Sequence, residues 1–165
     1  MSKIYPSGSG SFVSVRGHPL HPMLVPFPIA FLNGVLVSDL IYVIGNNPFW
    51  ATASFWLLCA GVVTGLLAAL GGVLEATKVK RARKLAITWL HGGANVVAIV
   101  AACINLWLRW GEHTAGVVPV GIVLSVCVAV ILAVSAWFGG ELTFRHGVGV
   151  MPTVGGQGRP ENERY

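Results

Sequence analysis

The sequence predicts an all-α integral membrane protein built as one bundle of four membrane-spanning helices. Hydrophobic residues make up 55% of the 165 residues and charged residues only 10%, whereas a soluble domain has about a quarter charged residues. The apolar residues gather in four long runs, at about 23–44, 49–74, 85–108 and 117–138. Each run is long enough to cross a hydrocarbon core of about 30 Å. The segments between the runs are short, so we expect one bundle, residues 23–139, without a separate soluble domain.

A polar tail, residues 1–22, precedes the first run and has no apolar core, so it is not expected to be a cleavable signal peptide. Pro22 suits the first turn of a helix, where the missing N–H is no loss. The segment 45–48, Gly-Asn-Asn-Pro, is typical of a stop and a turn. We therefore expect the first helix to be bounded at both ends.

The second run carries small residues at three- and four-residue spacing, namely Gly61, Gly65, Ala68 and Gly72. Such a stripe lets neighbouring membrane helices approach closely, so it predicts tight helix packing. The fourth run is expected to end at Gly139 and Gly140, which leaves a second polar, glycine-rich tail at residues 140–165. The three cysteines fall inside apolar runs without a Cys-x-x-Cys spacing, so neither disulfides nor a thiolate metal site is predicted.

The basic residues predict the orientation in the membrane. With four crossings, both tails and the basic loop 78–84 lie on one side, and this side holds ten of the 11 Lys and Arg residues. The positive-inside rule therefore places both termini in the cytoplasm. This charge lies tight against the bilayer, where it attracts anionic lipid, and it does not suggest nucleic-acid binding.

Most of the histidines fall near the predicted cytoplasmic face. The polar residues expected to converge there are His18 and His21 before the first helix, His91 in the third, His146 after the fourth, and Glu75 and Glu141 at helix ends. Taken singly, the loop histidines fit surface positions and the glutamates fit pairs with nearby basic residues. His91 differs, because an ionisable residue inside a membrane helix is costly and marks a functional site. Together the six residues predict a cofactor or metal site.

The nature of the bound group stays open between two classes. Histidine nitrogens from facing helices are axial ligands of b-type haem, and the small residues on helices two and three would make room for a macrocycle. The same histidines, with Glu75 or Glu141, also fit copper, zinc or non-haem iron. A third reading is a structural membrane subunit without a cofactor. Covalent haem attachment is excluded, because Cys-x-x-Cys-His is absent.

A second polar pair is predicted on the external side. Asp39 lies near the external end of the first helix, and Arg109 ends the third helix on the same side. A buried charge in a membrane protein usually has a partner. We therefore expect a structural ion pair between Asp39 and Arg109, in preference to a path for protons or ions.

Several motifs resemble a bacterial membrane family called domain of unknown function 2231. They are Gly17-His18-Pro19-Leu20-His21-Pro22-Met23-Leu24-Val25, Phe27-Pro28-Ile29-Ala30, His91 with Asn95, Gly139-Gly140-Glu141-Leu142 and His146-Gly147-Val148-Gly149-Val150. The resemblance implies a four-helix membrane protein similar to small haem-b membrane cytochromes, with some relatives linked to Rieske-type electron carriers. It assigns the motif histidines as His18, His21, His91 and His146, and it brings no biochemical activity with it.

The sequence therefore predicts a membrane b-type haem protein that passes electrons, with His91 and His21 as the axial ligands. His18 and His146 are expected to lie around these ligands or to bind a second centre. The expected electron partner is a quinol or a Rieske-type or other carrier, and the protein is expected to form homo-oligomers. The sequence identifies no substrate site and assigns no reaction.

Overall fold

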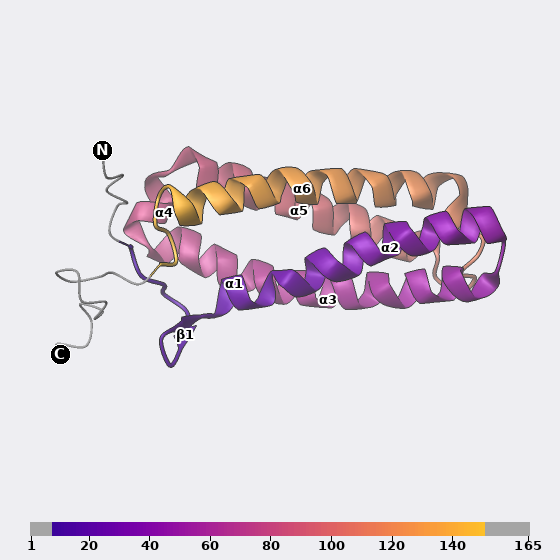
Figure 1. Ribbon diagram of the computed structural model, residues 1–165, viewed down its shortest axis with the longest axis horizontal. Coiled ribbons are helices and arrows are strands. Elements are labelled where there is room, and N and C mark those ends of the chain that lie inside the picture. The colour runs from indigo at the N-terminus through magenta and orange to yellow at the C-terminus, as the bar shows by residue number, and fades with distance from the viewer. Residues whose placement is uncertain (1–7, 151–165) are drawn as a thin grey trace.

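The computed structural model describes residues 8–150 and shows an elongated bundle of antiparallel helices (Figure 1). The helices are α1 (Leu20–Leu24), α2 (Pro26–Gly45), α3 (Pro48–Lys78), α4 (Lys80–Lys84), α5 (Ala86–Leu108), a π-helical turn η1 (Val117–Gly121) and α6 (Ile122–Phe144), and a small hairpin is formed by β1 (Ser14–Val15) and β2 (His18–Pro19). Four spans are long and apolar enough to cross a membrane: Leu20–Gly45, Pro48–Lys78, Ala86–Leu108 and Val117–Phe144. The predicted four-helix membrane fold is confirmed.

The helices extend further than the apolar runs at one end of the bundle. The first span begins at Leu20, ahead of Pro22, and α3 continues past Glu75 to Lys78. α6 continues through Gly139 and Gly140 to Phe144, so the glycine pair expected to end the fourth helix lies inside it. Glycine weakens a helix in water, but in a membrane small residues are tolerated where helices pack closely. The end that holds α4 and the C-terminal end of α6 is called the basic end below.

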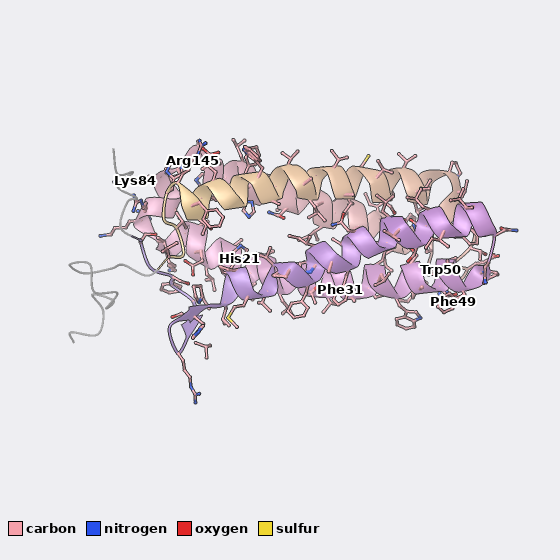
Figure 2. All side chains as sticks on the ribbon, in the orientation of Figure 1. His21, Phe31, Phe49, Trp50, Lys84 and Arg145 are labelled. Atoms are coloured by element: carbon pink, nitrogen blue, oxygen red, sulfur yellow. The ribbon has the colours of Figure 1, made fainter. Side chains whose placement is uncertain are left out.

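The outward surface of the bundle is apolar. Large exposed side chains include Leu66 and Leu70 on α3, Val96 and Val100 on α5, and Val130 on α6. A soluble monomer rarely exposes a continuous apolar surface of this size. Figure 2 shows Phe49 and Trp50 near the end opposite the basic end, where aromatic side chains are expected at a membrane interface. The protein is therefore a multi-pass membrane protein in contact with the lipid bilayer.

Each long helix turns one stripe of residues, spaced three and four apart, into the bundle. On α5 this stripe is formed by Thr88, His91, Asn95, Ala98, Ala102, Asn105 and finally Arg109 at the helix end, all buried or half-buried. Spacing of this kind keeps one seam of a helix against its neighbours. Along this stripe, polar residues lie at both ends and small apolar residues lie between them. The interior of the bundle is therefore arranged in layers.

The buried core of the middle layer is apolar. Its buried residues are Leu32 and Val35 of α2, Leu58 and Val62 of α3, Ala98 and Ala102 of α5, and Val128 and Leu132 of α6. This layer separates the histidines near the basic end from the polar residues at the opposite end. A continuous path for protons or ions through the bundle would have to cross this apolar core, which disfavours such a path.

The turn from α5 into α6 depends on glycine. A Cβ atom on Gly121 would overlap the carbonyl oxygen of Gly116 and would lie 2.9 Å from Nη2 of Arg109 and 3.1 Å from Oδ1 of Asn105. The first of these neighbours is backbone, which cannot move aside as a flexible side chain can. Close contact between the two backbone segments therefore requires glycine at this position.

We expect Gly121→Ala to lower the free energy of unfolding by about 1–3 kcal/mol or more, because the added methyl group overpacks a tight contact. Denaturant titration in detergent micelles measures this change. Gly45→Ala is the matched control, because no atom lies within 4 Å of its Cβ position. Equal destabilisation by the two substitutions would contradict the packing argument.

Candidate functional site

His21 lies on the short helix α1, against the basic half of α3 (Figure 2). Its ring nitrogen Nδ1 is 2.8 Å from the backbone oxygen of Ala68. Two glycines of α3 make this approach possible, since a Cβ on Gly72 would lie 3.0 Å from Cε1 of the imidazole and one on Gly71 would lie 3.4 Å from the Cβ of His21. Part of the small-residue stripe predicted on α3 therefore serves to seat a histidine.

His91 is held in the same way by the other pair of helices. Its Nδ1 is 2.9 Å from the backbone oxygen of Ser135 on α6. A Cβ on Gly139 would lie 3.1 Å from Cε1 of His91, which gives the glycine inside α6 a clear role. Asn95 donates one amide hydrogen bond to Oγ of Ser135 at 2.7 Å and another to the backbone oxygen of His91 at 2.8 Å.

These contacts determine which nitrogen of each histidine carries a hydrogen. A backbone carbonyl only accepts hydrogen bonds, so Nδ1 is the donor in the contacts of His21 with Ala68 and of His91 with Ser135. Nδ1 of His91 also lies 3.0 Å from Oγ of Ser135, which can accept or donate. In the neutral imidazole the other nitrogen, Nε2, then has a free lone pair. The Nδ2 atom of Asn95 lies 3.3 Å from Nε2 of His91, but the two shorter bonds already account for both hydrogens of that amide. A metal-binding histidine usually donates its other ring N–H to a backbone carbonyl, a carboxylate or a water.

The two imidazoles face each other across the bundle. Their ring centres are 6.4 Å apart, and the ring planes cross at 82°. A metal–imidazole bond is about 2 Å long and the ring centre lies about 1 Å beyond the nitrogen, so two imidazoles on opposite sides of one metal have centres about 6 Å apart. At a tetrahedral angle the same bonds would bring the centres to about 5 Å. The distance between the ring centres is thus close to that of two imidazoles bound to one metal.

The remaining predicted ligands do not join this pair. His18 lies exposed on the β1–β2 hairpin, where its Nδ1 is 3.1 Å from the backbone oxygen of Arg16. His146 is half-buried beyond the end of α6, with its backbone N–H bound to the oxygen of Glu141. Glu141 forms a salt bridge of 3.1 Å with Arg145, one turn away on the same helix. Such a pair of neighbouring side chains was the alternative expected for this glutamate.

Glu75 has a different partner from the basic loop expected for it. Its Oε1 accepts hydrogen bonds from the hydroxyl of Ser11 and, at 3.1 Å, from the backbone N–H of Val13. The N-terminal segment also binds the C-terminal segment, because the N–H of Ser9 donates to Gly147 and that of Gly10 to Val150. The segment from Ser9 to Val13, called the strap below, therefore crosses the basic end of the bundle.

Within residues 8–150, no three histidine, cysteine or acidic residues come together in a group that could hold a metal ion. The expected convergence of four histidines and two glutamates is thus reduced to His21 and His91. The reason lies in chain geometry: these two lie on helices and face the bundle axis, whereas His18 and His146 lie on segments outside the helices. Sequence reasoning missed Ser135 and the seating role of Gly139, although both continue the inward stripe of α6.

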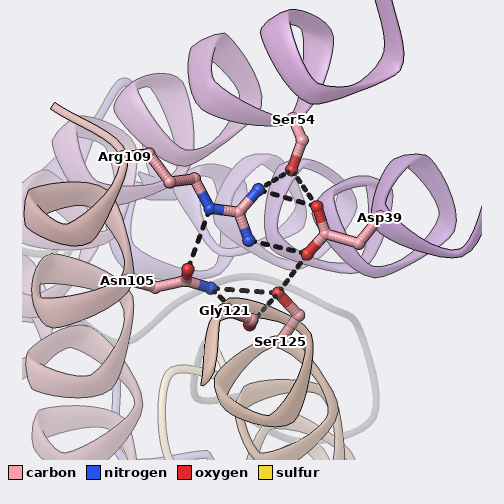
Figure 3. Close-up of polar contacts among 6 residues, drawn as sticks. All are labelled: Asp39, Ser54, Asn105, Arg109, Gly121 and Ser125. Atoms are coloured by element: carbon pink, nitrogen blue, oxygen red, sulfur yellow. Dashed lines mark hydrogen bonds and ion pairs between the residues drawn. The ribbon is translucent and has the colours of Figure 1, made fainter. Parts of the chain in front are cut away.

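The opposite end of the bundle holds a buried network around Arg109 (Figure 3). Nη1 and Nη2 of Arg109 donate to the two carboxylate oxygens of Asp39 at 2.7 and 2.8 Å, and both side chains have no exposed surface. Ser54 and Ser125 each donate to Asp39 at 2.6 Å, and Asn105 accepts from Nε of Arg109 at 2.9 Å. The predicted Asp39–Arg109 pair is confirmed, and its partners come from all four long helices.

The family model described as predicted membrane protein (DUF2231) matches residues 17–152. This range contains the four spans, both central histidines and the Asp39–Arg109 pair. No curated protein and no solved structure gave a significant match. Since the match covers most of the 165 residues, the chain belongs to the DUF2231 family of predicted membrane proteins.

Proposed function

We propose that this protein is a b-type haem protein that passes electrons in the cell membrane of a bacterium, with His21 and His91 as the axial ligands. The observation that carries the proposal is the pair of neighbouring imidazoles, with ring centres 6.4 Å apart and each Nδ1 bound to a backbone carbonyl of a neighbouring helix. Axial histidine pairs inside helical membrane bundles are typical of b-type haem.

The residues present fit this group. The donor set is two imidazoles with their Nε2 lone pairs available, and no carboxylate lies in the pair. Two glycines lie against the histidine rings: a Cβ on Gly72 would lie 3.0 Å from Cε1 of His21, and one on Gly139 would lie 3.1 Å from Cε1 of His91. When bound, haem iron supplies one-electron chemistry by cycling between the ferric and ferrous states.

The chain itself sets the properties of such a centre. The carbonyls of Ala68 and Ser135 orient the two imidazoles and make Nε2 a better electron donor, which favours the oxidised iron. The apolar middle layer shields the site on the side away from the basic end, and low polarity disfavours a net charge on the centre. These two effects, together with the partial exposure of the histidines, tune the reduction potential.

We further propose that the basic end faces the cytoplasm, because Lys78 and the charges of α4, Lys80–Lys84, gather there. The histidine pair then lies in the cytoplasmic half of the membrane. A quinol in the bilayer or a Rieske-type or other carrier is the partner that this position suits. Homo-oligomers within the membrane would keep the same arrangement in each copy.

The test is an absorption spectrum of the detergent-purified protein, oxidised and then reduced with dithionite, with metal analysis of the same sample. We expect a Soret band, sharp α and β bands on reduction, and iron near one per chain for a single centre. A colourless protein that carries copper, zinc or iron would replace this proposal with a non-haem metal site. Absence of any metal from freshly isolated membranes as well as from purified protein would leave a structural subunit.

A further inference from the structure

Two buried polar atoms near the histidine pair have no hydrogen-bond partner among residues 8–150. They are Oε2 of Glu75 and Oγ1 of Thr88. Glu75 is 7% exposed and Thr88 is 8% exposed, so the bilayer and the bulk solvent do not supply the missing bonds. A buried polar atom left without a partner costs about 1–3 kcal/mol, and more when the group is charged. Each of these two atoms therefore indicates a nearby group that binds it.

The two residues lie at the same level of the bundle. α3 and α5 run antiparallel, and a Cβ on Gly65 would lie 3.6 Å from Ile99. Glu75 is ten residues beyond Gly65 and Thr88 is eleven residues before Ile99, which places both about 15 Å from this contact towards the basic end, at 1.5 Å per residue. Both belong to the inward stripes of their helices, so their side chains turn towards the same interior region.

This region adjoins the histidine pair. Thr88 precedes His91 by three residues on the same face of α5, one helical turn away. Glu75 follows Gly71 by four residues on α3, and Gly71 and Gly72 are the glycines that contact His21. The two unpartnered atoms therefore lie one turn from the histidines, on the side towards the basic end.

The chemistry of the two atoms identifies the ligand. Oε2 of a carboxylate needs a donor, and a threonine hydroxyl can donate and accept. The other carboxylate oxygen, Oε1, is already occupied by the strap through Ser11 and Val13. A water molecule suits this gap, because it is small, both donates and accepts, and typically makes about three bonds to buried polar groups.

We propose that Glu75 and Thr88 hold an ordered internal water, which links the strap at the basic end to the histidine pair. The polar chain runs from Ser11 to Glu75, through the water to Thr88, and ends one turn from His91. A water dipole can reorient when the charge of a nearby centre changes, so this site stabilises an added electron there. The existence of the water does not depend on the proposed haem, and only its response to reduction rests on that function.

The direct test is a structure of the full chain in a lipidic phase, at a resolution that shows ordered waters. We expect a water peak at hydrogen-bond distance, about 2.7–3.2 Å, from both Oε2 of Glu75 and Oγ1 of Thr88. Thr88→Val keeps the side-chain shape and should remove the peak. Thr77→Val is the matched control, since its exposed hydroxyl bonds to the backbone oxygen of Val73 at 2.7 Å; this variant should keep the peak. A wild-type structure without the peak, or a peak retained in Thr88→Val, would overturn the proposal.

The response to reduction is tested by infrared difference spectra of reduced minus oxidised protein, recorded in ordinary water and in water labelled with heavy oxygen. We expect an isotope-sensitive water band in the wild type and in Thr77→Val, and its loss in Thr88→Val. A protein with haem bands but no isotope-sensitive band would refute the link to the redox centre and leave the haem proposal intact. A protein without haem would refute the proposed function. The water peak in the structure would then be the test of the Glu75–Thr88 site.

Discussion

Replacing His91 with alanine should remove haem from the purified protein. Loss of a residue that only hydrogen-bonds to a metal ligand costs about 10–100-fold in affinity for the metal. Loss of the ligand itself should cost at least as much. We therefore expect haem per chain, measured from the reduced α band, to fall about tenfold or more. His21→Ala should have the same effect, because the two imidazoles face each other at 6.4 Å.

The control for this prediction is His113→Ala. His113 stacks on Phe55 with ring centres 4.1 Å apart, near the opposite end of the bundle, so its loss should leave the haem content unchanged. A defect in folding is separated from a lost ligand by supplying imidazole during expression of His91→Gly, which should restore part of the Soret band. Equal haem retention in the His91→Ala, His21→Ala and His113→Ala proteins would remove the proposed site.

The second large effect is expected at the buried ion pair. Arg109→Leu removes the cation that pairs with the carboxylate of Asp39. Both side chains have no exposed surface, so the remaining charge stays buried. Removing one partner of a buried pair costs about 3–5 kcal/mol, because the remaining charge is uncompensated. We expect a loss of this size in the free energy of unfolding, measured by denaturant titration in micelles.

Two further variants show whether the cost comes from the unpaired charge. Adding Asp39→Asn to Arg109→Leu removes the charge and should recover part of the lost stability, since replacing both members of a buried pair is often nearly neutral. Arg145→Leu breaks an exposed salt bridge, in which the arginine side chain is 73% exposed, and should cost only about 0–1 kcal/mol. If Arg109→Leu costs no more than Arg145→Leu, the ion pair does not hold the four helices together.

Much of this protein could be predicted from local sequence. Run length and composition establish four membrane helices, because a hydrocarbon core accepts only long apolar helical segments. Spacing along α5 places His91 and Asn95 on one inward face. Position along the helices also predicts that Asp39 and Arg109 meet, because both lie near the same end of antiparallel segments and neither charge tolerates an apolar interior alone.

The sequence analysis named His21 as the partner of His91, but the contacts that seat the two rings and keep His18 and His146 away from them required the tertiary structure. Helical periodicity ends at the bundle boundary, so it could not show that α1 begins early enough to seat His21 on Gly71 and Gly72. Nor could it show that the hairpin turns His18 outward, since the path of a loop depends on contacts between residues far apart in the chain.

The sequence by itself determined the membrane fold, the intramembrane histidine and the Asp39–Arg109 ion pair, because each follows from the high cost of polar groups in an apolar surrounding. Only the tertiary structure decided that the carbonyls of Ala68 and Ser135 orient the two imidazoles, that Gly139 lies inside a helix, and that Glu75 binds the strap. The hydrogen bonds among these contacts join residues between 44 and 64 positions apart in the chain. Gly139 likewise packs against His91, which lies on another helix. Such pairings depend on how the helices pack together, which the pattern of any single helix does not specify.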